Sequence, residues 1–355
     1  MRKRLRVALI YNADPGSTPE LPEDRGSTTD LRSMIRRMAR AMRRCGHRVD
    51  IFPLRRDLFQ FQRRLRRYNP DVVFNQYEDV VHGALYEMRV SALLQLMGYP
   101  QTGSPALPLG LYRYKYMAAA LLQGVGVPLP QQTSLLERIG DVDAHGWRFP
   151  LIVQPSQEHA GIGLDRTSII HSKKALRTKV RDILRIYSQP ALVQSFLSGR
   201  EFNVGLLGGR RMRVLPLAEV DYSQPPPQIP PIMSYAAKFI DTSEEFKKTS
   251  VICPAAVAPE LAREIGATAL RAFRALGGWG YGRVDMRLDE EGRPIVLEVN
   301  CNPSLEPQVA LARSALAAGI SYPQLLQTIL KVALDTHPYD VNIPMLPPLP
   351  VRAAT

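Results

Sequence analysis

Two short segments near the C-terminal end of the chain alternate between apolar and polar residues, a pattern typical of half-buried β-strands. The first segment is 283–288 and the second is 295–300, with a four-residue turn at 289–292 between them. This spacing predicts an antiparallel hairpin in which position 283 lies opposite 298 and position 285 lies opposite 296. Leu297 would then lie on the apolar face and Val296 on the polar face.

The predicted polar face gathers three oxygen-bearing side chains, those of Asp285, Glu298 and Asn300. Such oxygens suit Mg²⁺, which takes few protein ligands and completes its octahedron with phosphate and water; Mn²⁺ is a second candidate. A merely solvated hairpin face would alternate in the same way. The polar end of the second strand, which runs into Asn302, and the glycines at 277–282 favour the metal site. Cys301 would face away from the metal ligands and pack in the interior.

Strand-like and helix-like segments alternate over the first hundred residues, which predicts a parallel sheet of the α/β class. The strands expected along the whole chain are 6–11, 47–52, 71–75, 151–154, 191–194 and 201–207. The expected helices, besides an Arg-rich one after the first strand, are 57–68, 85–97, 111–124 and 259–276. The apolar face of the Arg-rich helix would consist of Leu31, Met34, Ile35, Met38 and Met42.

Composition describes an ordinary globular chain with a strong positive charge. Of 355 residues, 45% are hydrophobic, and the net charge is +13, most of it within residues 1–70, which hold 18 Lys and Arg against seven acids. A nucleic-acid surface is one interpretation of this charge. We favour the interpretation that these basic residues form the solvent-exposed face of the Arg-rich helix, because no aromatic platform or nucleic-acid motif accompanies the charge.

Three scattered cysteines indicate neither disulfides nor a cysteine metal site. Without a signal peptide or an apolar run of about 20 residues, we expect a cytoplasmic protein.

The hairpin segment from Gly278 to Ser304 resembles the C-terminal metal motif of the ATP-grasp superfamily, and specifically that of D-alanine–D-alanine ligase-like enzymes. Phe74-Asn75 and Gly98–Ser104 resemble the end of the family's N-terminal domain, and Tyr112-Arg-Tyr-Lys115 resembles the entry to its nucleotide site. The resemblance extends from about residue 70 to 335. It implies an α/β protein with a Rossmann-like N-terminal parallel sheet followed by the two-lobed ATP-grasp fold, whose C-terminal part is α+β.

The expected parts are an N-terminal pre-ATP-grasp domain (1–104), a central ATP-grasp lobe (105–194), a C-terminal lobe with the metal site (195–335) and a Pro-rich tail (336–355). By resemblance, the cofactors are ATP and Mg²⁺. Lys115 would contact an ATP phosphate, Glu201 the ribose hydroxyls and Lys238 the terminal phosphate. The nucleotide site would be completed by Gln154, Gln194, Leu197 and a lid that contains Gly161 and Gly163.

The implied reaction begins with phosphorylation of a substrate carboxylate by ATP, after which an amine attacks the acyl phosphate to form an amide or peptide bond. Arg283 would stabilise the oxyanion and Lys238 would hold the transferred phosphoryl group. Glu87, Asn302 and Ser304 are candidates for the substrate side. The partners would be small carboxylates and amines, such as amino acids or dipeptides. We expect no membrane or nucleic-acid partner, and the analogy with the family suggests a homodimer.

Several positions depart from the family pattern. Gln154-Pro155 stands where the family usually has Lys-Pro, and Gln194-Ser195 where it has an acid and a lysine. The glutamate of the family's first loop, the serine of its lid and the tyrosine after its loop lysine are replaced, in the regions 14–20, Ala160-Gly161 and Phe239. We therefore expect a ligase with substrates other than two D-alanines. A true D-alanine–D-alanine ligase, with Glu78 or Glu87 as the amine anchor, and a nucleotide-binding protein without turnover stay open as alternatives.

Overall fold

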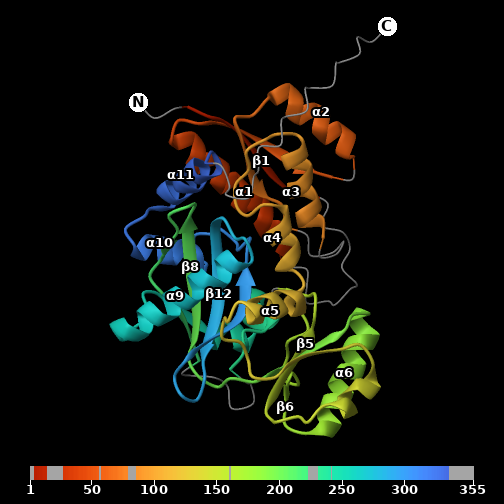
Figure 1. Cartoon of the computed structure of the whole chain (residues 1–355). Helices are drawn as coiled ribbons and strands as arrows, with labels where there is room; N and C mark the ends of the chain where they lie inside the picture. The colour runs from red at the N-terminus through yellow and green to blue at the C-terminus, as the bar shows by residue number, and fades with distance from the viewer. Residues whose placement is uncertain are drawn as a thin grey trace.

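The computed structural model describes residues 4–13, 27–55, 57–78, 85–159, 161–222, 231–240 and 242–335. The predicted Pro-rich tail (336–355) and the first-loop region (14–20) lie outside these ranges. Within them, no helix combines the length and the apolar character that crossing a bilayer requires. Figure 1 shows an elongated arrangement, with the N-terminal sheet and its helices at one end and the small lobe around α6 at the other.

The N-terminal part is the parallel sheet that the alternating pattern predicts, with strand order β2-β1-β3. Its elements are β1 (Arg6–Asn12), α1 (Ser27–Arg44), β2 (Arg48–Leu54), α2 (Leu58–Tyr68), β3 (Val72–Gln76) and α3 (Tyr86–Leu96). One face of the sheet packs against α1 and the other against α2 and α3, because successive strand residues point to opposite faces. Buried Met34, Ile35, Met38 and Met42 confirm the apolar face predicted for α1.

The central part is a small antiparallel sheet with strand order β4-β7-β5-β6. Its elements are β4 (Thr133–Leu136), the short 3₁₀ helix η2 (Ile139–Ala144), β5 (Leu151–Pro155), β6 (Ile169–Ile170), α6 (Lys173–Tyr187) and β7 (Ala191–Ser195). The apolar face of α6 packs on this sheet, and the buried residues of that core all lie between Leu136 and Val193. This lobe therefore has a core of its own.

The C-terminal part is a larger sheet with strand order β11-β10-β8-β12-β13, to which β9 adds on β8. Its elements are β8 (Glu201–Gly208), β9 (Arg213–Val214), β10 (Ala218–Asp221), α7 (Tyr235–Phe239), α8 (Glu244–Lys248), β11 (Ser250–Ile252), α9 (Pro259–Ala275), β12 (Gly280–Leu288), β13 (Pro294–Asn300), α10 (Ala310–Ala317) and α11 (Tyr322–Ala333). α9 covers one face of the sheet, together with α4 (Ala106–Leu111) and α5 (Lys115–Gly124). α10 and α11 cover the other face, and α11 also packs on α1 (Figure 1).

The helix expected at 111–124 begins only at Lys115, as α5, and residues 112–114 separate it from α4, which ends at Leu111.

The β12–β13 hairpin forms, but the predicted register is wrong. Leu288 pairs with Pro294, so the turn is one residue longer than expected, and a β-bulge leaves Leu297 as an extra residue on β13. Asp285 consequently lies opposite Glu298, and Arg283 opposite Asn300. The bulge also reverses two predicted orientations, since Val296 packs in the core and Leu297 lines the pocket beside Glu298.

Close backbone packing accounts for the glycine run before the hairpin. A Cβ at Gly280, whose φ is +77°, would lie 3.1 Å from the Cα of Gly103, and a Cβ at Gly282 would lie 2.1 Å from the Phe273 ring. Any side chain at either position would clash. The glycines therefore bring β12 close to the N-terminal part and to α9, as the sequence indicated.

Candidate active site

A pocket lies between the sheet of the central lobe and the sheet of the C-terminal lobe. Ile152 and Gln154 from β5 line one wall, and Glu201 from β8 and Asp285 from β12 line the other. The pocket brings together eight of the residues that the sequence singled out, Lys115, Gln154, Gln194, Leu197, Glu201, Lys238, Asp285 and Glu298. Residues separated by up to 183 positions in the chain thus form one site.

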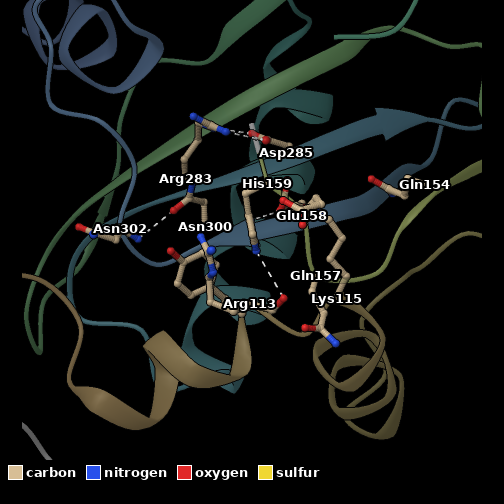
Figure 2. A network of polar contacts seen from close by, with 12 residues as sticks. Arg113, Lys115, Gln154, Gln157, Glu158, His159, Arg283, Asp285, Asn300 and Asn302 are labelled. Carbon is tan, nitrogen blue, oxygen red and sulfur yellow. Dashed lines mark hydrogen bonds and ion pairs between the residues drawn. The ribbon is translucent and has the colours of Figure 1, made fainter. Parts of the chain in front are cut away.

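Asp285 is held on both oxygens by neighbouring side chains. Arg283 donates from Nε to Oδ1 over 2.7 Å and from Nη2 to Oδ2 over 2.9 Å, and Asn203 Nδ2 donates to Oδ1 over 2.8 Å. Burial works against the charge of Arg283, but the adjacent Asp285 outweighs it and raises the pKa of the guanidinium. The guanidinium is therefore charged, and the two hydrogen bonds fix the orientation of both side chains, which lie side by side in Figure 2.

Glu298 receives two donors on a single oxygen. Lys115 Nζ and His159 Nδ1 each lie 3.0 Å from Oε1, and Lys115 also donates to the carbonyl oxygen of Glu158 over 2.6 Å. Burial opposes ionisation of Glu298, but Lys115 and His159 outweigh it and place its pKa well below the ordinary value. Burial, Lys115 and Arg113 together lower the pKa of His159 to about 3, so the ring is neutral at physiological pH.

The third predicted metal ligand, Asn300, uses its Oδ1 to accept a hydrogen bond from the backbone N–H of Asn302 over 2.8 Å. No group of three or more His, Cys, Asp or Glu that could hold a metal occurs in the described ranges. As a ligand set, Asp285 and Glu298 would supply two carboxylates and Asn300 one amide oxygen. This small set of hard oxygens fits Mg²⁺, which takes its remaining ligands from phosphate and water.

Glu201, the predicted ribose ligand, is buried and paired with Arg287. Arg287 Nε donates to Oε2 of Glu201 over 2.8 Å, and Tyr222 donates its hydroxyl to the same oxygen over 3.0 Å. Arg287 also donates to the carbonyl of Leu197 over 2.6 Å and lies against the rings of Phe196 and Tyr222. Oε1 of Glu201 takes no part in these bonds and can accept from a hydroxyl.

Two amides occupy the wall where the family has charged residues. Gln154 Nε2 lies 3.5 Å from Gln194 Oε1, and Gln194 Nε2 lies 3.5 Å from the Thr133 hydroxyl, both at the limit of a hydrogen bond. The predicted lid glycines have φ values of +84° at Gly161 and +78° at Gly163. A Cβ on Gly161 would lie 2.7 Å from the backbone nitrogen of Tyr235. The lid thus approaches the backbone of α7.

Lys238 extends from α7 into the pocket. Burial and the charge of Arg283 lower its pKa, while Asp285 and Glu298 oppose the shift. A half-buried lysine surrounded by both signs of charge is well placed to receive a phosphate.

The three candidates for the substrate side lie outside the lining of this pocket. Glu87 is buried and accepts from the Tyr112 hydroxyl over 2.6 Å and from Arg113 over 3.4 Å. Asn302 accepts from the Tyr281 hydroxyl over 3.0 Å. Ser304 accepts from the backbone N–H of Glu306 over 3.3 Å. Their assignment to the substrate stays a prediction.

Sequence reasoning missed several members of the network, above all His159, Asn203 and Arg287. Arg287 was recognisable, because it continues the polar face of β12 two residues after Asp285. Asn203 lies two residues after Glu201 on β8 and faces Asp285 across the sheet. No local pattern marks His159, which lies in the loop after β5 and meets Glu298 only through the tertiary fold.

Comparison with known proteins identifies the family. A family model described as "D-ala D-ala ligase C-terminus" matches residues 127–331, more than half of the chain. This chain belongs to the D-alanine–D-alanine ligase family. It is an ATP-grasp ligase, as the motifs implied. A D-alanine–D-alanine ligase from Halorhodospira halophila is 32% identical over 295 residues, which cover 83% of this chain and 88% of that protein.

Another relative of this ATP-grasp ligase is the uncharacterized protein y4sG from Sinorhizobium fredii, 31% identical over 344 residues, with 93% of this chain and 97% of that protein covered. Among solved structures, a D-alanine–D-alanine ligase from Bacillus anthracis complexed with ATP superposes with a TM-score of 0.70 at 21% identity, over 93% of this chain and 97% of that one. A second structure of that enzyme gives 0.69. The predicted ATP-grasp fold is confirmed.

Proposed function

We propose that this ligase uses Mg-ATP to activate a carboxylate and joins it to an amine, with substrates other than two D-alanines. The observation that carries the proposal is the pocket itself, where two lysines, Lys115 and Lys238, face two carboxylates, Asp285 and Glu298. The lysines would neutralise the phosphates of ATP. When bound, Mg²⁺ held by Asp285, Glu298 and Asn300 would supply positive charge to the phosphate oxygens.

The chemistry proceeds in two steps. An oxygen of the substrate carboxylate attacks the terminal phosphorus of ATP, and ADP leaves. The amine nitrogen then attacks the acyl carbon, inorganic phosphate leaves and the amine loses a proton. Arg283 uses Nε and Nη2 to hold Asp285, which leaves Nη1 for the oxyanion that forms on the acyl carbon. Lys238 would hold the phosphoryl group during its transfer.

The sequence departures from the family pattern on the substrate side support substrates other than two D-alanines. The first-loop region 14–20 and Ala160 lie outside the described residues, and so does the side chain of Phe239. Of the alternative amine anchors, Glu87 is already bound by Tyr112 and Arg113. Glu78, the other alternative anchor, lies near Glu87.

The second candidate is a true D-alanine–D-alanine ligase. It is favoured by the relatives that carry this name, including one from Geobacter sulfurreducens that is 32% identical over 274 residues. Both candidates share the same pocket and the same first chemical step. The two candidates differ only in the substrate whose carboxylate is phosphorylated and in the amine that attacks it.

The deciding experiment measures ADP release from Mg-ATP in the presence of pairs of D- and L-amino acids and dipeptides, with mass spectrometry of each positive reaction. We expect release that requires two added substrates and yields a condensed product other than D-alanyl-D-alanine. Condensation of two D-alanines alone would establish the second candidate. Asp285→Asn serves as the control, because it removes a carboxylate of the proposed metal site and should abolish release.

A further inference from the structure

His159 lies where three segments of the chain meet. It belongs to the loop after β5, and its Nδ1 is 3.0 Å from Oε1 of Glu298 on β13. Its Nε2 is 3.4 Å from the carbonyl oxygen of Arg113 (Figure 2). Its ring meets the Tyr112 ring edge-on with centroids 5.2 Å apart. Nδ1 is the donor in the contact with Glu298, because a carboxylate oxygen can only accept.

Glu298 therefore has two donors of different kinds. Lys115 brings a charge that the proposed function assigns to an ATP phosphate, whereas His159 brings a ring N–H and is not among the residues that line the pocket. Both donors use Oε1, so the geometry leaves Oε2 for another ligand. When Lys115 turns to phosphate, His159 is the donor that stays on Glu298 among the described residues.

We propose that His159 is a positioning residue that holds Glu298 in the orientation needed to bind a divalent cation once Lys115 has moved to the nucleotide. The inference rests on the proposed role of Glu298 as a metal ligand. Hydrogen-bond partners of metal-ligating side chains fix the orientation of the ligand, and their loss typically lowers metal affinity by about 10- to 100-fold. His159 also ties the loop after β5 to β13, so cation binding and the position of this loop are coupled.

Two substitutions separate the hydrogen bond from the packing of the ring. His159→Phe keeps a ring against Tyr112 but removes the donor. His159→Asn loses much of the ring but places an amide N–H near the position of Nδ1. If His159→Phe lacks a cooperative thermal transition, His159→Leu replaces it, because Leu and Asn have similar size and differ in the donor. His171→Phe, at an exposed position, is the matched control.

The experiment is calorimetric titration of the full chain with a non-hydrolysable ATP analogue, once in EDTA and once in excess MgCl₂. The ratio of the two dissociation constants gives the gain in affinity that Mg²⁺ provides. We expect His159→Phe to leave binding in EDTA unchanged within about twofold and to reduce the magnesium gain at least about tenfold. His159→Asn and His171→Phe should keep the gain within a few-fold of the parent.

A full magnesium gain in His159→Phe overturns the inference, and so does an equal loss in His159→Phe and His159→Asn, which would show that the effect does not depend on the hydrogen-bond donor. Glu298→Gln is titrated alongside. If that variant keeps the full gain, the metal role of Glu298 in the proposed function fails, and the inference fails with it. If Glu298→Gln loses the gain and His159→Phe keeps it, only the inference fails.

Discussion

Gln154 places an uncharged amide on the pocket wall, at a position where the family usually has a lysine. Its contact with Gln194 is long, so the side chain can be replaced without breaking a strong bond. If Gln154 faces phosphate, Gln154→Lys should tighten binding of ATP about tenfold, because a hydrogen bond to a charged group contributes roughly 1.5–3 kcal/mol. Calorimetric titration with ATP measures the change.

Gln123→Lys is the control for the added charge alone, because Gln123 is exposed on α5. It should leave ATP affinity unchanged. Equal affinity in Gln154→Lys and the parent would place the terminal amide of Gln154 away from the phosphates.

Glu78 predicts a pH dependence of stability. Burial, with Glu87 and Glu306 nearby, raises its pKa to about 8 against the opposing charges of Arg113 and Arg283. Between an unfolded pKa of 4.5 and this value, the folded chain holds a proton that the unfolded chain releases. The free energy of unfolding therefore falls as pH rises through this window.

Glu78→Gln should remove this fall, so that at pH 8 the variant is more stable than the parent by on the order of 3 kcal/mol, with little difference at pH 5. Urea unfolding followed by circular dichroism at pH 5, 6.5 and 8 measures it. The exposed Glu290→Gln should behave as the parent. Parallel pH profiles for Glu78→Gln and the parent would contradict a buried, proton-holding Glu78.

At the scale of elements, α1 separates a packing face from a charged face. Met38 is fully buried between the N-terminal sheet and α11, whereas Arg36 is exposed. Met38→Ala should lower the free energy of unfolding by about 2–5 kcal/mol through lost burial and a cavity. Arg36→Ala should change it by less than about 0.5 kcal/mol. Urea unfolding of the two variants measures the contrast, and a large loss in Arg36→Ala would show that its charge has a structural partner.

The sequence predicted most elements but not all of their connections. Period-two and helical spacing identified β1, β3, α1 and the hairpin, because burial imposes those periods directly. The register of the hairpin was wrong by two positions, one from the longer turn and one from the bulge at Leu297. Since two is even, Asp285, Glu298 and Asn300 still share a face, so the metal site stays a prediction that the error in register does not affect.

Contacts that depend on three-dimensional packing lay beyond the sequence. Glu298 meets His159 across 139 positions of chain, and no local spacing encodes such a meeting. The partnership of Glu201 with Arg287 likewise follows from the pairing of β8 with β12. Residue type and order along the chain predicted the candidate ligands, whereas their hydrogen-bond donors emerged only from the fold.

At the scale of the whole molecule, the N-terminal part shares its core with the C-terminal end. Met34 and Ile35 of α1 pack in one cluster with Leu325 and Ile329 of α11. A fragment of residues 1–104 lacks α11 and should therefore unfold without a cooperative transition. Residues 128–196 keep the entire core of the central lobe and should melt more sharply. Thermal circular dichroism of the two fragments measures this, and a sharp melt of fragment 1–104 would contradict it.

The packing of α1 on α11 also decides how the molecule responds to tethering. Both ends of the described chain, β1 and α11, are anchored in one core at the same end of the molecule (Figure 1). Tension applied between β1 and α11 would act first on the core that these two elements share with α1. None of the described residues that line the pocket belongs to that core, so the pocket lies off the shortest path between β1 and α11.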